Sequence, residues 1–102
     1  MTTDPIVVFA SFHPVPGKAD ELRDLLSWMV ENTRTEPGCE RYDLYRQDGT
    51  AEVFHLFERY RDQGALQAHR SAGYYVDYRR RVADLIEGDV GVIILHPLDV
   101  VG

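Results

Sequence analysis

The stretch IVVFASF at residues 6–12, followed directly by HPVPG at residues 13–17, decides the fold. The first segment is short, β-branched and aromatic, which predicts a buried strand. Prolines and a glycine then break the strand, and from Lys18 onward the apolar residues recur with the period of a helix. The stripe on this helix consists of Leu22, Leu25, Leu26, Met29 and Val30. The Glu-Pro-Gly sequence at residues 36–38 ends it.

Two further strands follow and form a predicted hairpin. Residues 39–46 alternate, with Tyr42 and Leu44 on one face, and residues 52–60 alternate in the same way. Between them, the sequence QDGT at residues 47–50 contains the Asp-Gly pair that is typical of a hairpin turn. One face of the second strand would carry Phe54, Leu56, Glu58 and Tyr60.

The rest of the chain predicts a broken helix and a last strand. Asp62 is placed to cap a short helix over residues 63–70, and the sequence SAG at residues 71–73 interrupts it. A second helical stripe then consists of Tyr75, Tyr78, Val82, Leu85 and Ile86. Residues 87–89 end this stretch, and residues 90–96 predict the final strand.

The element order β-α-β-β-α-β predicts an α+β fold of the ferredoxin-like kind, as a single domain over residues 1–102. Right-handed crossovers turn this order into a four-stranded antiparallel sheet with the helices on one face. The other face would carry apolar side chains such as Val7, Phe9 and Phe57. A second copy of the chain is the best cover for such a face, so we expect a homodimer.

Composition and charge narrow the class of partner. The 102 residues are 44% hydrophobic and 27% charged, with a formal net charge of −6. This acidic balance argues against nucleic acid as a partner, because binding to polyphosphate begins with a basic surface. The apolar run at residues 92–95 is too short to span a membrane, and the N-terminal residues do not resemble a signal peptide. The single cysteine, Cys39, permits no internal disulfide, so we expect a cytoplasmic protein.

The sequence contains no motif typical of a metal or cofactor site. The four histidines, His13, His55, His69 and His96, are spread over the predicted strands and one helix without metal-ligand spacing. A phosphate-binding glycine loop and a dinucleotide fingerprint are also missing from the sequence. We therefore expect no metal, flavin or haem in the protein.

Several short motifs, taken in order and spacing, resemble the antibiotic biosynthesis monooxygenase domain family, the dimeric α+β barrels. They are the strand and Pro-Gly start at 12–17, the Glu-Pro-Gly-Cys turn at 36–39, Tyr-Asp-Leu-Tyr at 42–45, Phe-Glu-Arg-Tyr at 57–60, and the segment 65–71. The resemblance covers almost the whole chain and implies a homodimer with one cavity per subunit between sheet and helices. Members of this family include cofactor-independent oxygenases of aromatic polyketides, and relatives include quinol oxygenases, haem-degrading enzymes and isomerases.

The haem-degrading branch of that superfamily fits this sequence poorly. That branch uses an Asn in the first strand, a Trp near the end of the short helix and a His on the following helix. The corresponding positions hold Ala10, His69 and Arg79. The resemblance therefore implies no haem here.

Two residues are candidate catalytic groups. His69, where the family often has a histidine, would face the cavity as a general acid or base, because a histidine titrates near neutral pH. The alternative is a capping or core histidine that bonds a carbonyl. Glu58 would be an acid among apolar groups, where burial raises its pKa and makes it a proton donor. The alternative, which we favour for Glu58, is a structural carboxylate paired with an arginine or with backbone N–H groups.

Five residues are candidates for binding a small aromatic or hydrophobic substrate. Tyr42, Phe54, Tyr75 and Tyr78 would line a flat pocket for a ring, and the alternative for each is ordinary core packing. The arginines at 79–81 point in different directions on a helix and favour a solvated face. Of the three, Arg79 is our candidate to turn toward the cavity and an anionic ligand.

These observations leave three hypotheses for function. The first is a cofactor-independent monooxygenase that oxidises a small phenol, hydroquinone or polyketide-like molecule with O2, because the substrate anion itself passes an electron to O2. The protein would bind the ring, stabilise the anion and exclude water. The second is a small-molecule binding or isomerase protein that uses the same pocket without O2. The third is a structural or regulatory dimer whose pocket has lost its chemistry.

Overall fold

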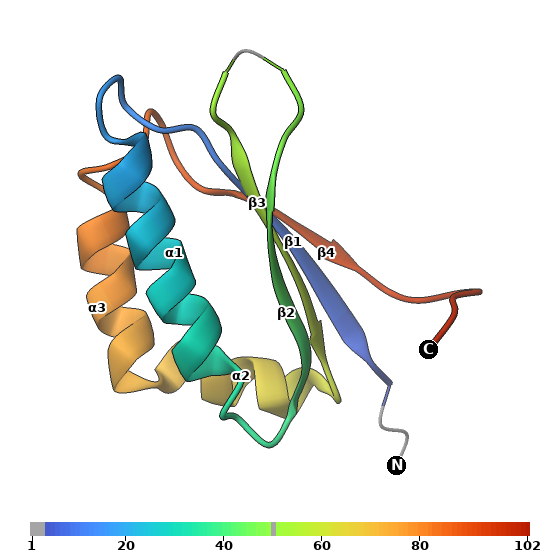
Figure 1. The fold of residues 1–102 in the computed structure, drawn as a ribbon. Coiled ribbons are helices and arrows are strands. Elements are labelled where there is room, and N and C mark those ends of the chain that lie inside the picture. Colours follow the sequence, from blue (N-terminus) through green and yellow to red (C-terminus); the bar gives the residue numbers. More distant parts are fainter. Residues whose placement is uncertain (1–3, 50) are drawn as a thin grey trace.

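The computed structural model describes residues 4–49 and 51–102, which form a four-stranded antiparallel sheet with three helices on one face (Figure 1). The strands are ordered β2-β3-β1-β4 in the sheet. The elements are β1 (Ile6–Phe12), α1 (Ala19–Thr33), β2 (Cys39–Arg46), β3 (Phe54–Tyr60), α2 (Gln63–Ser71), α3 (Gly73–Val82) and β4 (Gly91–Leu95). This is the α+β, ferredoxin-like fold that the sequence predicts. No helix in these two ranges has the length and hydropathy needed to cross a lipid bilayer.

The third helix is shorter than its apolar stripe. The stripe extends to Ile86 in the sequence, whereas α3 ends at Val82. The chain leaves the helix in a turn in which the Leu85 N–H donates to the Val82 carbonyl. Ile86 then forms an isolated bridge with Pro14 at the end of β1. Leu85 and Ile86 are therefore buried as the stripe predicts, although neither is helical.

The predicted hairpin forms, with a longer connection than a tight Asp-Gly turn. The last paired residues are Arg46 of β2 and Phe54 of β3, so the connection covers residues 47–53. Gly49 has a φ of +132°, a backbone conformation that only glycine adopts easily. Thr50, which belongs to the predicted turn, lies outside the described residues.

The core lies between the inner face of the sheet and the helices. Alternate residues of β1 and β3 are buried on this face, and α1 presents the predicted stripe. Leu22, Leu25, Leu26 and Met29 are at most 1% exposed, and burial of each contributes roughly 1.5–3 kcal/mol. A smaller cluster joins the sheet to α2 and consists of Ile6, Val8, Tyr60, Ala65 and Leu66.

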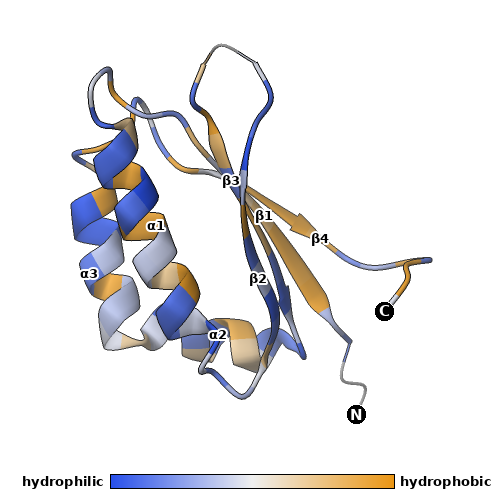
Figure 2. Ribbon diagram, viewed as in Figure 1, coloured by the Kyte–Doolittle hydropathy of each residue, from blue (hydrophilic) through white to orange (hydrophobic). Residues whose placement is uncertain are grey.

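In the described structure no helix covers the outer face of the sheet, and β1 and β4 are largely hydrophobic strands (Figure 2). Phe9 lies directly opposite Phe57 on this face. Both phenylalanines are only partly buried, as we expect for a sheet face against which no helix of the same chain packs. Val7 lies on the same face as Phe9, as predicted, and it is the better buried of the two, with 6% of its surface exposed. Its neighbours across the strands are the long side chains of Arg59 and Leu95, which explains its burial.

Gly38 offers a test of the contact between the loop after α1 and α2. A Cβ atom at Gly38 would lie 2.4 Å from the Cβ of Ala65, and neither atom can rotate away. We expect Gly38→Ala to lower the free energy of unfolding by about 1–3 kcal/mol. Gly73→Ala is the matched control, because nothing lies within 4 Å of its Cβ position. Urea unfolding of both variants checks this, and equal stabilities would contradict it.

Candidate functional site

An inner cavity lies between the sheet and the two short helices, where the two apolar clusters meet. All four strands and both short helices contribute to its lining, which consists of Val8, Ala10, Tyr42, Glu58, His69, Arg70, Tyr75, Tyr78, Arg79, Val90 and Val92. Six of the seven predicted site residues are in this set. Its volume is about 30 Å³, which is room for one or two water molecules.

Phe54 is the predicted site residue that lies elsewhere. It stands at the start of β3, opposite Phe12 and Arg46, and belongs to the main hydrophobic cluster. Glu58 follows it on the same face of β3 at a distance of roughly 13 Å along the strand. The sequence alternation thus assigned Phe54 to the correct face, but position along the strand separates it from the cavity.

His69 is held on α2 and is almost completely buried, with 2% of its surface exposed. The helix begins at Gln63, and the Asp62 side chain caps it by accepting from the Ala65 N–H at 2.8 Å. The His69 ring packs against Tyr60 and Tyr75, with ring centroids 5.3 and 5.0 Å away. Burial lowers the pKa of His69, so the imidazole is neutral at pH 7 and able to accept a proton.

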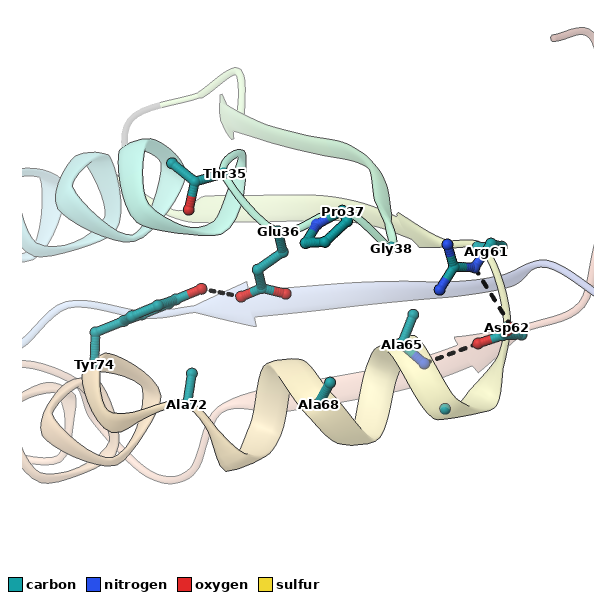
Figure 3. A pocket seen from close by; sticks show the side chains of 11 residues that line it. Thr35, Glu36, Pro37, Gly38, Arg61, Asp62, Ala65, Ala68, Ala72 and Tyr74 are labelled. Atoms are coloured by element: carbon teal, nitrogen blue, oxygen red, sulfur yellow. Dashed lines mark hydrogen bonds and ion pairs between the residues drawn. The ribbon is translucent and has the colours of Figure 1, made fainter.

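Glu36 is the partner of His69, and neither interpretation of the histidine included it. Its Oε2 atom lies 2.8 Å from Nδ1 of His69. The hydroxyl of Tyr74, from the start of α3, donates to the same carboxylate oxygen (Figure 3). Burial, together with Glu36, raises the pKa of Tyr74. Glu36 precedes Pro37 in a non-periodic turn 33 residues before His69, so no periodicity in the sequence could have paired the two.

An outer groove of about 590 Å³ lies on the other side of this pair, between the loop after α1 and α2 (Figure 3). Glu36 and Tyr74 line the groove, and three alanines of α2 and its end, Ala65, Ala68 and Ala72, form part of its wall. His69 lines the inner cavity and not this groove. Glu36 thus stands between the groove and the buried histidine.

Glu58 is buried on the inner face of β3, as the alternation predicts, with 6% of its surface exposed. Its partner is the hydroxyl of Tyr60, which donates to Oε1 at 2.5 Å, rather than an arginine or backbone N–H groups. Burial raises the pKa of Glu58 to about 7, against the opposing effects of this hydrogen bond and of Arg70. At neutral pH the carboxyl is therefore present in both protonation states.

Two arginines, Arg70 and Arg79, line the inner cavity beside these groups. As predicted, the arginines of α3 diverge: Arg80 pairs with Asp77, and the Arg81 guanidinium lies 5.1 Å from the centre of the Trp28 ring. Neither lining arginine forms an ion pair with a carboxylate among the described residues. Sequence reasoning missed Arg70, which directly follows His69. The two arginines, Arg70 and Arg79, thus give this acidic protein a cationic site at the cavity.

The described residues, 4–49 and 51–102, contain no group of three or more His, Cys, Asp and Glu side chains that could hold a metal ion. Cys39 is half-buried, and burial raises the pKa of its thiol to about 11. It is therefore protonated at neutral pH and unsuited to nucleophilic or ligand chemistry.

Comparisons with known proteins agree on one family. A family model described as antibiotic biosynthesis monooxygenase matches residues 5–81. The "Putative monooxygenase Rv0793" of Mycobacterium tuberculosis is 44% identical over 97 residues, which is 95% of each chain. The "Putative monooxygenase YcnE" of Bacillus subtilis is 26% identical over 88 residues, which is 86% of this chain and 93% of that one.

Solved structures show the same likeness. The structure of Rv0793 superposes with a TM-score of 0.91 at 42% identity and covers 96% of this chain and 99% of its own. PA3566 of Pseudomonas aeruginosa gives a TM-score of 0.88 at 27% identity, covering 97% of this chain and 99% of its own.

The raised pKa of Glu58 predicts how stability depends on pH. The pKa of the Glu58 carboxyl is about 7 in the folded state, whereas in the unfolded chain it has the ordinary value of 4.5. The free energy of unfolding should therefore fall by about 3 kcal/mol as the pH rises between these values. Glu58→Gln keeps an acceptor for Tyr60 but cannot ionise, so it should remove this loss.

Urea unfolding from pH 4 to pH 8 measures the effect, and the difference between the wild type and Glu58→Gln isolates this carboxyl. Glu52→Gln, at an exposed position, is the matched control and should follow the wild-type curve. Parallel curves for the wild type and Glu58→Gln would show that burial does not hold the Glu58 proton.

Proposed function

The chain belongs to the antibiotic biosynthesis monooxygenase family, and from this premise we propose that it oxidises a small phenol or hydroquinone with O2 without a cofactor. The observation that carries the proposal is the inner cavity, in which a neutral, buried His69 lies among tyrosines, a carboxyl and two arginines. The names of the relatives support monooxygenase chemistry. The aromatic lining and the arginines support an acidic aromatic substrate.

The reaction begins with proton transfer from the substrate hydroxyl to His69. The resulting anion passes one electron to O2, and the substrate radical and superoxide combine to form a C–O bond. His69 returns its proton to the peroxide, and the O–O bond then breaks as the same carbon loses its proton to the Glu58 carboxylate. One oxygen stays as a carbonyl, and the other leaves as water. A phenol and one O2 thus give a quinone and one water, so atoms and electrons balance.

The residues divide this work by position. His69 takes the first proton, and Glu58, with its pKa of about 7, returns a proton to the leaving hydroxide. Arg70 and Arg79 stabilise the substrate anion, and Tyr42, Tyr75 and Tyr78 hold the ring. A cavity of about 30 Å³ must widen to admit a ring, because a benzene-sized ligand occupies a cavity of roughly 150 Å³. The exposed arginines and Val92 are the lining groups with freedom to move.

We further propose that the protein works as a homodimer joined through the outer face of the sheet. The support for this is the uncovered apolar surface that β1 and β4 present on that face, where Ile93 pairs with Phe9 and is 56% exposed. Burial of such a face against a second copy removes apolar surface from water and gives a closed two-fold assembly.

The cytoplasm, where the reducing conditions suit the single Cys39, is the proposed location.

Light scattering checks the dimer. At micromolar concentration we expect about twice the 11.7 kDa mass of the chain. Ile93→Asp should give a monomer, because it places a charge on the apolar surface that the second copy would bury. Val76→Asp is the matched control, since Val76 is 53% exposed but lies on α3, away from this face. A wild type that stays monomeric at this concentration would end the proposal.

Substitution of His69 tests the oxygenase. With a panel of phenols and hydroquinones, we expect His69→Ala to lower the rate of oxygen uptake by roughly 10²–10⁴-fold, the usual effect of losing a positioned acid or base. His13→Ala, at an exposed position, should leave the rate unchanged. Thermal unfolding accompanies the assay. A destabilised but fully active His69→Ala protein would exclude this role, and ligands that stabilise the wild type without oxygen uptake would favour a binding or isomerase protein.

A further inference from the structure

We propose that Glu36 is a positioning residue that holds His69 in the tautomer protonated at Nδ1 and so presents Nε2 to the inner cavity as the basic nitrogen. The tautomer is a property of the fold. Only the use of Nε2 as the catalytic base rests on the proposed function.

The hydrogen bonds around Glu36 place the protons. Its Oε2 atom is bonded to both the Nδ1 atom of His69, at 2.8 Å, and the hydroxyl of Tyr74. A carboxylate oxygen accepts two hydrogen bonds readily and, when ionised, donates none. The shared oxygen is therefore the acceptor from both sides, so the imidazole proton resides on Nδ1. A neutral imidazole carries one proton, which leaves Nε2 with a free lone pair.

The position of the His69 ring places Nε2 on the side of the inner cavity. Nδ1 faces Glu36, which lines the outer groove, whereas the His69 side chain also lines the inner cavity with Glu58 and Arg70. The two nitrogens lie on different sides of the imidazole ring, so the side away from Glu36 belongs to the cavity. A hydrogen bond to the other ring nitrogen is the usual means by which a protein selects the reactive one.

Glu36 also makes protonation of His69 possible. Burial among Tyr42, Tyr60 and Tyr75 disfavours an imidazolium, and Arg70 beside it acts in the same direction. Glu36 is the neighbour that opposes both effects. Without its charge, His69 would be a much weaker base in the same cavity. The charged groups around His69 are thus Glu36 from the loop, Arg70 from α2, Glu58 from β3 and Arg79 from α3.

Two contacts fix Glu36 in turn. The Tyr74 hydroxyl reaches it from α3 and lies 3.4 Å from the Asn32 carbonyl at the end of α1. The loop that carries Glu36 is joined to the segment after β3 and to α2, because the Arg61 N–H donates to the Gly38 carbonyl at 2.8 Å and Gly38 contacts Ala65. The carboxylate is therefore held by Tyr74, and the loop that carries it is held by backbone contacts, as a residue that orients another group needs to be.

NMR of ¹⁵N-histidine-labelled protein tests the proposal, with the His69 signals assigned from their absence in His69→Gln. In the wild type at pH 8 we expect Nδ1 to show the shift of a protonated nitrogen and Nε2 that of an unprotonated one. Glu36→Gln should weaken proton binding at His69 by roughly tenfold or more, the effect of removing an adjacent opposite charge. Tyr74→Phe should act in the opposite direction, because it leaves the carboxylate with one donor fewer. Glu36→Asp, which keeps the charge, should restore part of the proton affinity.

Glu31→Gln is the matched control, because it removes one exposed carboxylate from α1 and should leave the titration of His69 unchanged. A wild-type His69 protonated at Nε2, or a titration that Glu36→Gln does not shift, would overturn the proposal. With an active substrate, the acidic limb of the pH–rate profile should move with the NMR titration in Glu36→Gln. If the tautomer is found but His69→Ala stays fully active, the proposed function fails and the assignment of Glu36 stands.

Discussion

Burial of the inner face of the sheet against helices of a different period is the constraint on which this structure depends. The strands present apolar residues with a period of two, and α1 presents its stripe with a period of 3.6. The side chains of the sheet and of α1 pack closely together, and Leu22 and Leu26 of α1 are fully buried. The packing is incomplete where α2 and α3 meet the sheet, and there the two hydrophobic clusters leave a small gap. The polar residues of the inner cavity, His69 and Glu58, occupy that gap.

The break between α2 and α3 shapes this gap. Ala72 has an extended backbone, with φ −66° and ψ 144°, and serves both as the C-cap of α2 and as the N-cap of α3. The change of direction allows Tyr74 and Tyr75, at the start of α3, to return toward His69 near the end of α2. A continuous helix would have carried those side chains away along its axis. The short interruption therefore brings two tyrosines of α3 to the histidine of α2.

The parts of the molecule that follow from local pattern could be predicted from the sequence, and the parts that depend on distant contacts could not. Alternation and helical period locate the strands and helices, and alternation alone assigns Glu58 to the buried face. The same alternation cannot say how far along β3 a cavity reaches, and so it predicts a place in the site for Phe54, which the structure puts elsewhere. Glu36 shows most clearly what cannot be predicted from the sequence, because its role comes from a contact with His69 that only the folded chain creates.

The two edges of the sheet differ in chemistry, and this bears on how the protein behaves in concentrated solution. β2 forms one edge and carries Glu40, Arg41 and Arg46, charges that discourage a foreign strand from pairing there. β4 forms the other edge and reads GVIIL, with every residue exposed, and Leu98 and Val101 beyond it are almost fully exposed. An apolar edge strand of this kind is a template for further strand addition. In the proposed homodimer, a subunit separated from its partner would therefore tend toward aggregation rather than persist as a soluble monomer, and the proposal thus links colloidal stability to assembly through one short strand.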